Sequence, residues 1–405
     1  MAQADSGHLT VASVASRPAV RIAPGLGWAA LAFLLALLLR LSTLGDLALW
    51  YDEVITADVA AASWPGLVAD RLANGHFPTY FALLKTIGLA GASELTLRLP
   101  SAIFDSLAAA LVTIVALRLS GRVGAIAALL LYAFYPALVQ YGQEARPYAL
   151  MLAFLALAIF GQVGLLTERA NPGRQALLAT IGTLGAALVM PAGIVPVALQ
   201  HLALPLCGFR GFSSARKRLW WRHILVTWAG ILCAAAFLIP AVLAQAAKPV
   251  GLMKWQTRDS FGQRVLEAFG QTYGFVVPGD IDRYLSAGCN GWIAAGFLGL
   301  MLAGFLVHRA RPAFRMLAVT AFGTPVVFLV LGIFSASAGR YLIGMLPAAI
   351  LLAGASRASP PAPPSPSSSA ASPSSRSTCW SRRENTTGAR SRPSCTRMAS
   401  PIRRS

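Results

Sequence analysis

The sequence has few charged residues, and this scarcity limits what the protein can be. Asp, Glu, Lys and Arg make up 12% of its 405 residues, hydrophobic residues make up 56%, and mean hydropathy is +0.62. A soluble domain carries about 25% charged residues, so a globule with this composition would lack the polar side chains that cover a surface in water. The composition excludes a soluble enzyme, a disordered chain and a nucleic-acid-binding module, and it requires apolar surface that faces lipid.

Acidic residues and cysteines are also scarce. The chain has 15 acids against 34 bases, for a net charge of +19. Nine arginines and one acid, Glu384, fall in residues 356–405, so much of the basic charge belongs to the C-terminal segment. The five cysteines form no C-x-x-C pair, and their spacing indicates neither a zinc site nor a disulfide framework.

Apolar runs dominate the rest of the sequence, and about 20 such residues cross a bilayer. We therefore expect an all-α membrane protein with about ten transmembrane helices. A shorter run, 77–91, lies near the lower limit of length for spanning. The ten longer runs are residues 26–44, 97–117, 123–141, 147–166, 175–190, 192–209, 223–244, 291–307, 314–334 and 341–355.

Basic residues between these runs predict the orientation, because cytoplasmic loops carry an excess of Lys and Arg. They fall on one side only if 77–91 does not cross, so we expect interfacial helices in the first outer loop. Both termini of this multi-pass plasma-membrane protein are then cytoplasmic. The bases that define the inner side are Arg17, Arg21, Arg118, Arg122, Arg169, Arg174, Arg210, Arg216, Lys217, Arg218, Arg222, Arg309, Arg311 and Arg315.

The N-terminal part divides into a leader and a membrane domain. We expect a cytoplasmic leader at 1–25 and a polytopic domain at 26–355, with large outer loops at 45–96 and 245–290. The length of the leader favours an uncleaved first span over a signal peptide. Arg40, near the outer end of this span, is expected to snorkel to the interface.

Residues 356–405 change abruptly to Pro, Ser, Ala and Arg. Such a composition cannot bury a core, so we expect a disordered basic tail. It is either a solvated segment near anionic lipid or an out-of-frame terminus, and composition alone does not distinguish them.

The first of three polar clusters on the outer side is Leu49-Trp50-Tyr51-Asp52-Glu53. Adjacent carboxylates at a membrane surface can bind a cation or remove a proton from a hydroxyl. The alternative is a helix N-terminus, where the macrodipole stabilises acids.

The second cluster is His76-Phe77-Pro78-Thr79-Tyr80, which Glu94 and Arg98 follow. These residues form either a polar site or an ordinary helix start with an i,i+4 ion pair. The third cluster, Gln140 to Tyr148, holds an acid, a base, amides and two tyrosines in nine positions. It is either a site or an aromatic and charged interface anchor.

Further polar residues lie outside the three clusters. Lys254 and Arg258 fall in the second large outer loop, and Arg340-Tyr341 begins the last span. These cations either hold a phosphate or sit among lipid headgroups. Asp105 lies inside a span, where an acid is either functional or paired with a neighbouring helix.

The order of these motifs from about residue 26 to 355 resembles the C-type membrane glycosyltransferases, specifically the protein O-mannosyltransferase and aminoarabinose-transferase-like group (family 39-like). The matching segments are Leu-Trp-Tyr-Asp-Glu, His-Phe-Pro-Thr-Tyr, Ser93-Glu94 with Leu97-Arg98-Leu99-Pro100-Ser101, Gln143-Glu144-Ala145-Arg146-Pro147-Tyr148, and Arg340-Tyr341-Leu342 with Pro347. The resemblance implies transfer of a sugar from a polyprenyl-phosphate donor to an extracytoplasmic acceptor, which is a cell-envelope glycan, lipid or protein. Inversion at the sugar is also implied.

The resemblance also implies roles for individual residues. Asp52 is the expected catalytic base, and Asp52, Glu53 and Glu144 are candidate ligands of a divalent metal ion, the one cofactor considered. Membrane lipids are expected partners and nucleic acid is not. The implied substrate-binding residues are Glu53, His76, Tyr80, Glu94, Arg98, Gln143, Glu144, Arg146, Tyr148, Lys254, Arg258, Arg340 and Tyr341.

Two alternatives to an active transferase remain at this point. A lipid or solute carrier would show internal repeats and polar residues at mid-membrane, whereas the polar residues here gather at the predicted outer face. An inactive transferase-like scaffold is the other alternative, which the unusual tail favours and the intact Asp52-Glu53 pair disfavours.

Overall fold

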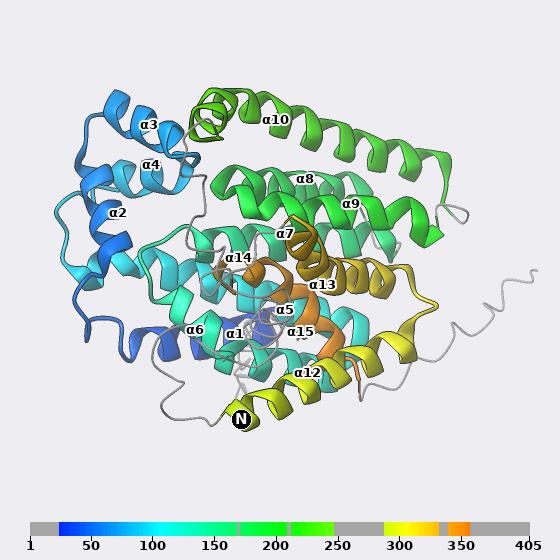
Figure 1. The fold of residues 1–405 in the computed structure, drawn as a ribbon. Helices are drawn as coiled ribbons and strands as arrows, with labels where there is room; N and C mark the ends of the chain where they lie inside the picture. The colour runs from blue at the N-terminus through cyan, green and yellow to red at the C-terminus, as the bar shows by residue number, and fades with distance from the viewer. Residues whose placement is uncertain (1–23, 168–170, 209–211, 247–286, 332–338, 357–405) are drawn as a thin grey trace, which may run out of the picture. The chain divides into compact units, whose positions relative to one another are not determined.

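A computed structural model describes residues 24–167, 171–208, 212–246, 287–331 and 339–356. Within these ranges all regular secondary structure is helical (Figure 1). The leader up to residue 23, most of the loop 245–290 with Lys254 and Arg258, and the tail from 357 lie outside the described residues. The helices are α1 (Pro24–Leu41), α2 (Tyr51–Ala61), α3 (Trp64–Ala73), α4 (Thr79–Thr86), α5 (Glu94–Phe134), α6 (Pro136–Gly142), α7 (Tyr148–Leu166), α8 (Pro172–Val189), η1 (Pro191–Gly193), α9 (Ile194–Gly208), α10 (Ser214–Ala246), α12 (Ala287–His308), α13 (Pro312–Val330), α14 (Gly339–Leu342), η5 (Ile343–Met345) and α15 (Leu346–Gly354).

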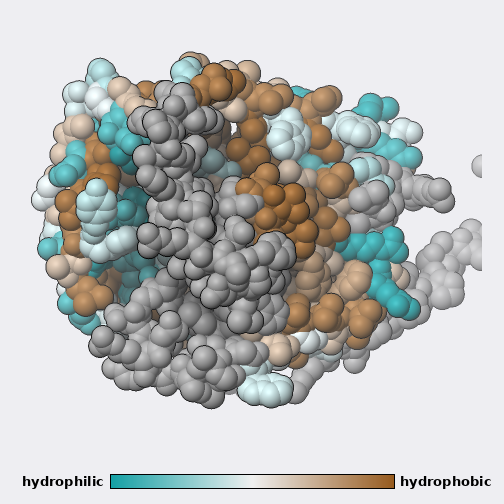
Figure 2. Space-filling model, in the orientation of Figure 1, coloured by the Kyte–Doolittle hydropathy of each residue, from teal (hydrophilic) through white to brown (hydrophobic). Residues whose placement is uncertain are grey.

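Four described helices are long and apolar enough to cross a membrane, namely α5, α7, α13 and the Ser214–Pro240 part of α10. Four shorter apolar helices fall at Gly25–Leu41, Pro191–Ala203, Trp292–His308 and Arg340–Gly354. Large apolar side chains project from α1 and α10, among them Leu34, Leu38, Leu225 and Phe237. In Figure 2, brown side chains gather to the right of the grey atoms and along the top of the view, and teal gathers toward its left and right ends. This distribution fits a helical bundle whose middle part contacts the hydrocarbon of a membrane. The total of ten spans stays a prediction.

The chain reverses direction inside α5, at Gly121. This glycine has a φ of +71°, a left-handed conformation that residues with a Cβ seldom adopt. The expected spans 97–117 and 123–141 lie on either side of it. The second of these was predicted too long, because the helix ends at Phe134 and Pro136 starts the separate α6, after an extended Tyr135.

Helices α7 and α8 pack with their backbones in contact. A Cβ on Gly161 would lie 2.4 Å from the backbone nitrogen of Ala179, and one on Gly182 would lie 2.3 Å from that of Ala158. Membrane helices associate largely through such small residues, because lipid offers no hydrophobic drive for helix pairing. The close packing fixes α8, whose C-terminal end reaches the site described below.

The segment 77–91 contains only the eight-residue helix α4. Eight helical residues extend about 12 Å, well short of the roughly 30 Å hydrocarbon layer. The short helix agrees with the prediction that this segment does not span. Figure 1 shows α2, α3 and α4 together at one end of the long helices.

Basic turns meet at the opposite end. Arg311, at the start of α13, donates from Nη1 to the carbonyl of Leu119 at 2.9 Å, beside the turn of α5. Arg118 lies over the ring of Phe160, 4.0 Å from its centroid, near the end of α7. Two of the predicted inner turns therefore lie together, as the charge pattern requires.

Arg40 does not snorkel, and that prediction was wrong. Its side chain is fully buried, and Nε donates to Oδ2 of Asp105 at 2.7 Å. Asp105 therefore pairs with a neighbouring helix, one of its two predicted roles. The carboxylate of Asp105 and two carbonyls inside the bundle give the guanidinium of Arg40 its partners, so it turns inward.

Candidate active site

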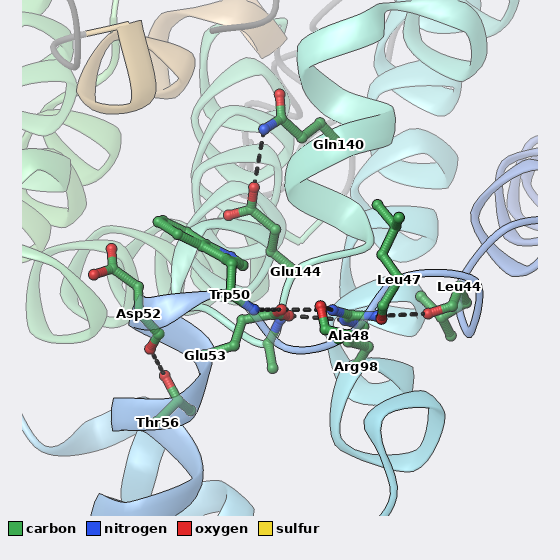
Figure 3. A network of polar contacts seen from close by, with 11 residues as sticks. Leu44, Leu47, Ala48, Trp50, Asp52, Glu53, Thr56, Arg98, Gln140 and Glu144 are labelled. Carbon is green, nitrogen blue, oxygen red and sulfur yellow. Dashed lines mark hydrogen bonds and ion pairs between the residues drawn. The ribbon is translucent and has the colours of Figure 1, made fainter. Parts of the chain in front are cut away.

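Glu53 is fully buried, and both of its carboxylate oxygens are engaged (Figure 3). Oε1 accepts from Nε of Arg98 at 2.9 Å and from the backbone N–H of Ala145 at 2.7 Å. Oε2 accepts from Nη2 of Arg98 at 2.6 Å and from the backbone N–H of Trp50 at 3.3 Å. The two parallel bonds from one guanidinium form the strongest type of side-chain ion pair. Glu53 thus joins the starts of α2 and α5 to the turn before α7.

Arg98 uses its remaining N–H groups on the segment between α1 and α2. Nη1 donates to the carbonyls of Leu44 at 3.1 Å and Leu47 at 2.6 Å, and Nη2 donates to that of Ala48 at 3.0 Å. Sequence spacing suggested a pair with Glu94, but the partner of Arg98 is Glu53, 45 positions earlier. Glu53 and Arg98 therefore hold the segments of the site together, and their predicted part in substrate binding stays a prediction.

Asp52 points away from this pair, to the other side of α2 (Figure 3). Its Oδ2 lies 3.3 Å from Nη2 of Arg146 and 3.2 Å from Nη1 of Arg340. Arg146 also donates from Nη1 to the carbonyl of Asp52 at 3.2 Å. The fold therefore brings together three predicted site residues from three distant parts of the sequence. The carboxylate stays 20% exposed, so an incoming molecule can reach it.

A small pocket lies next to this cluster. It is formed by side chains from α3, α4 and the turn between them, the 146–148 turn, the end of α8 and Tyr341. Arg71 and Arg146 supply positive charge, His76 and Tyr148 supply further polar atoms, and Phe81 supplies an apolar wall. A positively charged, partly aromatic pocket suits an anionic group attached to an apolar or ring-shaped body.

His76 is held neutral in this pocket. Burial, together with the positive charges of Arg146 and Arg71, lowers its pKa to about 4. At neutral pH the imidazole therefore adds a hydrogen-bond donor and an acceptor, and no charge. Its backbone N–H donates to the carbonyl of Arg71 at 2.8 Å, which fixes its position at the end of α3.

Glu144 lies in the same turn as Arg146. Its Oε1 accepts from Nε2 of Gln140 at 3.1 Å, and burial raises the pKa of its carboxyl to about 7, helped by the nearby charge of Glu53. Oε2 of Glu144 and Oε1 of Gln140 are buried acceptors with no partner among the described residues. Glu144 thus changes protonation near neutral pH, beside the arginines that face Asp52.

The other predicted site residues take varied positions. Tyr80 is fully buried, and its hydroxyl lies 2.9 Å from that of Ser101, so it packs α4 against α5. Burial raises the pKa of this hydroxyl further above neutral pH. Glu94 is exposed at the first position of α5, where the helix dipole favours an acid.

The structure offers limited support for a metal site. Among the residues it describes, no group of three or more His, Cys, Asp or Glu side chains is placed to hold an ion. Of the three candidate ligands, Glu53 already has all of its bonds to Arg98 and the backbone.

Arg71 is a pocket residue that the sequence did not indicate. It is buried, ion-paired with Asp70, and lies 4.7 Å above the ring of Phe81. In the sequence it looks like an ordinary charge in the last turn of a short helix. Its burial depends on α4 folding back over α3, and no local pattern reports that contact.

No protein-family model matches the sequence, and no curated protein matches it. Solved structures do match: that of ArnT from Cupriavidus metallidurans in the apo state superposes with a TM-score of 0.53 over 82% of this chain, at 17% identity. The fold is that of ArnT. The same ArnT bound to undecaprenyl phosphate superposes with a TM-score of 0.51, at 18% identity.

The matched part covers 60% of the length of ArnT. ArnT is an aminoarabinose transferase of the C-type group, so the resemblance inferred from the five motifs is confirmed as a likeness of fold. At this level of identity the likeness does not extend to substrate. The activity of the ArnT-like chain has to be argued from its own residues.

Proposed function

We propose that this chain is an integral-membrane glycosyltransferase that moves a sugar from a polyprenyl-phosphate donor to a hydroxyl acceptor on the extracytoplasmic side. The observation that carries the proposal is the contact of Asp52 with Arg146 and Arg340, beside a positively charged pocket. A carboxylate and two guanidinium groups are what this reaction needs, namely a proton acceptor and a site for an anionic leaving group. The ArnT-like fold, which in one structure binds undecaprenyl phosphate, supports it.

Each of the three residues has a role in the proposed reaction. The acceptor hydroxyl gives its proton to Asp52, and both ion pairs go to Oδ2, so Oδ1 is the oxygen proposed to take it. The acceptor oxygen then bonds to the anomeric carbon of the sugar. The bond from that carbon to the phosphate oxygen breaks, and its electron pair goes to the departing polyprenyl phosphate. Arg146 and Arg340 stabilise that charge, and attack from the opposite face inverts the anomeric carbon.

Neighbouring residues would shape the binding of both substrates. The pocket formed by Arg71, His76 and Tyr148 would receive the phosphate and the adjoining sugar. Glu144 would face the same substrate from the other side of Arg146. The acceptor is proposed to be a cell-envelope glycan, lipid or protein, since Asp52 lies at the end of the helices assigned to the outer face.

A carrier or a scaffold would need neither a proton acceptor nor its placement between two arginines. Asp52→Asn tests this difference, because Asn keeps the shape but accepts no proton. Transfer of radiolabelled sugar from polyprenyl-phosphate donors in membrane vesicles should fall by on the order of 10²–10⁴. Asp58→Asn, an exposed acid on the same helix, should leave transfer unchanged. Near-normal transfer by well-folded Asp52→Asn would exclude Asp52 as the base.

A further inference from the structure

A buried polar cluster lies inside the bundle, outside the proposed active site. Asp105 accepts from Nε of Arg40 at 2.7 Å through Oδ2, and from the hydroxyl of Tyr132 at 3.0 Å through Oδ1. Arg40 also donates from Nη1 to the carbonyl of Ala133 at 2.7 Å, and from Nη2 to that of Tyr132 at 3.3 Å. All three side chains are fully buried. The cluster joins α1 to both halves of α5, before and after its turn.

Burying an ion pair in a membrane bundle is costly, and apolar side chains would pack these helices at least as well. The position of the cluster offers a reason for its presence. Tyr132 and Ala133 lie three and two positions before Tyr135, where the chain leaves α5 and enters α6. Arg40 therefore holds the last turn of α5 at two carbonyls, just before the segment that leads into the active-site turn.

A second set of contacts connects the cluster to that turn directly. Nε2 of Gln143 donates to the carbonyl of Arg40 at 2.8 Å and to Oγ1 of Thr43 at 2.6 Å. Gly142 packs against the cluster so tightly that an added Cβ would lie 3.0 Å from Cγ of Arg40 and 3.2 Å from Cβ of Asp105. The residues that follow are Ala145, which donates to Glu53, and Arg146, which contacts Asp52.

We infer that Arg40, Asp105 and Tyr132, through Gln143, are positioning residues that set where Arg146 meets Asp52. This inference rests on the proposed function for its kinetic consequence, but the structural part stands without it. It also changes the role expected for Gln143, because this side chain binds the end of α1 and not a substrate. The cluster works at a distance: Asp105 touches neither Asp52 nor the pocket, and acts only through the turn.

The structural part is tested by hydrogen–deuterium exchange on the full chain in detergent. Gln143→Ala removes the connection, and Tyr132→Phe removes one bond to Asp105 without changing shape. Both should speed the exchange of the 143–146 amides at least several-fold, because these amides lose the contacts that hold the turn. Thr183→Val is the matched control: it deletes a buried hydroxyl bond to Thr227 elsewhere in the bundle and should not affect the turn.

The kinetic part is tested by transfer assays on the same variants. Gln143→Ala should lower kcat about tenfold, since small misplacement of catalytic groups is costly, with little change in KM or in the melting temperature. Binding of undecaprenyl phosphate alone should stay within twofold. Combined with Asp52→Asn, Gln143→Ala should add almost nothing, because both changes act through one contact.

The two readouts separate failure of this inference from failure of the proposed function. Unchanged exchange of the 143–146 amides would overturn the positioning role, whatever the activity. Normal kcat in Gln143→Ala, or losses that multiply with Asp52→Asn, would also overturn it. Faster exchange in a chain that transfers no sugar would uphold the positioning and reject the proposed function.

Discussion

Glu53 and Arg98 form a buried ion pair, with Oε2 and Nη2 2.6 Å apart, at the centre of the proposed active site. The carboxylate next to it in sequence, that of Asp52, faces two other arginines and solvent. Two adjacent acids thus have different environments because successive helical side chains point about 100° apart. One is available for chemistry, and the other holds three segments together.

The different environments of Asp52 and Glu53 predict that Glu53→Gln lowers the stability of the folded protein and does not act mainly on the chemical step. Gln keeps the shape but leaves Arg98 as a buried charge without its counter-ion, and breaking such a pair typically costs about 3–5 kcal/mol. The melting temperature in detergent should fall clearly, while that of Asp52→Asn should stay close to the starting protein. A Glu53→Gln protein as stable as the parent would contradict a structural role for Glu53.

The overall architecture could be read from the sequence because lipid imposes a simple pattern. Apolar runs of a given length must be helices, and the runs of basic residues share a side. Each of the ten predicted spans contains helical residues, and the short 77–91 segment is α4. What the pattern missed is local: the break at Tyr135 comes from Pro136, which apolar composition does not reveal.

The site was predictable as a group of residues but not as a set of roles. Motif order brought Asp52, Arg146 and Arg340 together correctly. It could not show that Glu53 pairs with Arg98, nor that Gln143 binds the end of α1, because these contacts depend on which residues 45 to 103 positions apart meet. The pairing of Arg40 with Asp105, 65 positions later, escaped prediction for the same reason.

Arg340 should require its planar guanidinium as well as its charge. It contacts Asp52 at 3.2 Å and lies 5.8 Å from the centroid of the Tyr341 ring. Arg340→Gln should lower kcat by on the order of 10², and Arg340→Lys should recover part of it, since Lys keeps the charge but not the forked donors. Arg309→Gln, an exposed arginine at the other end, is the control. Full activity of Arg340→Gln would remove this residue from the mechanism.

Glu144 should make stability depend on pH between about 4.5 and 7. Its pKa rises from 4.5 to about 7 on folding, through burial and the charge of Glu53, against Gln140, Arg146 and Arg340, which lower it. A carboxyl that binds its proton more tightly when folded favours folding below pH 4.5, and this contribution is lost as the pH rises through 7. In Glu144→Gln the side chain at this position has no carboxyl to titrate, so this contribution to the pH dependence of stability is absent.

The melting temperature of Glu144→Gln, relative to the starting protein, should therefore increase from pH 4.5 to 7 and level off above it. Thermal unfolding in detergent across this range measures the difference. Asp58→Asn changes an exposed acid on α2 and should show no such trend. A constant difference at every pH would mean that Glu144 is already ionised in the folded protein near pH 5.

The orientation of the bundle leads to the last prediction. The structure places Asp52 and the short helices α2–α4 at one end, and the basic turns at the other. Positive charge is retained on the cytoplasmic side, so the Asp52 end should face outward.

Two substitutions test this orientation, each at a small exposed side chain. Ala61→Cys lies on α2, at the Asp52 end, and Ser214→Cys lies at the start of α10, at the opposite end. In a background without the native cysteines, a membrane-impermeant maleimide on intact cells should label Cys at 61 and not at 214. After the cells are permeabilised, both should react. The opposite pattern would place Asp52 in the cytoplasm and rule out an extracytoplasmic acceptor.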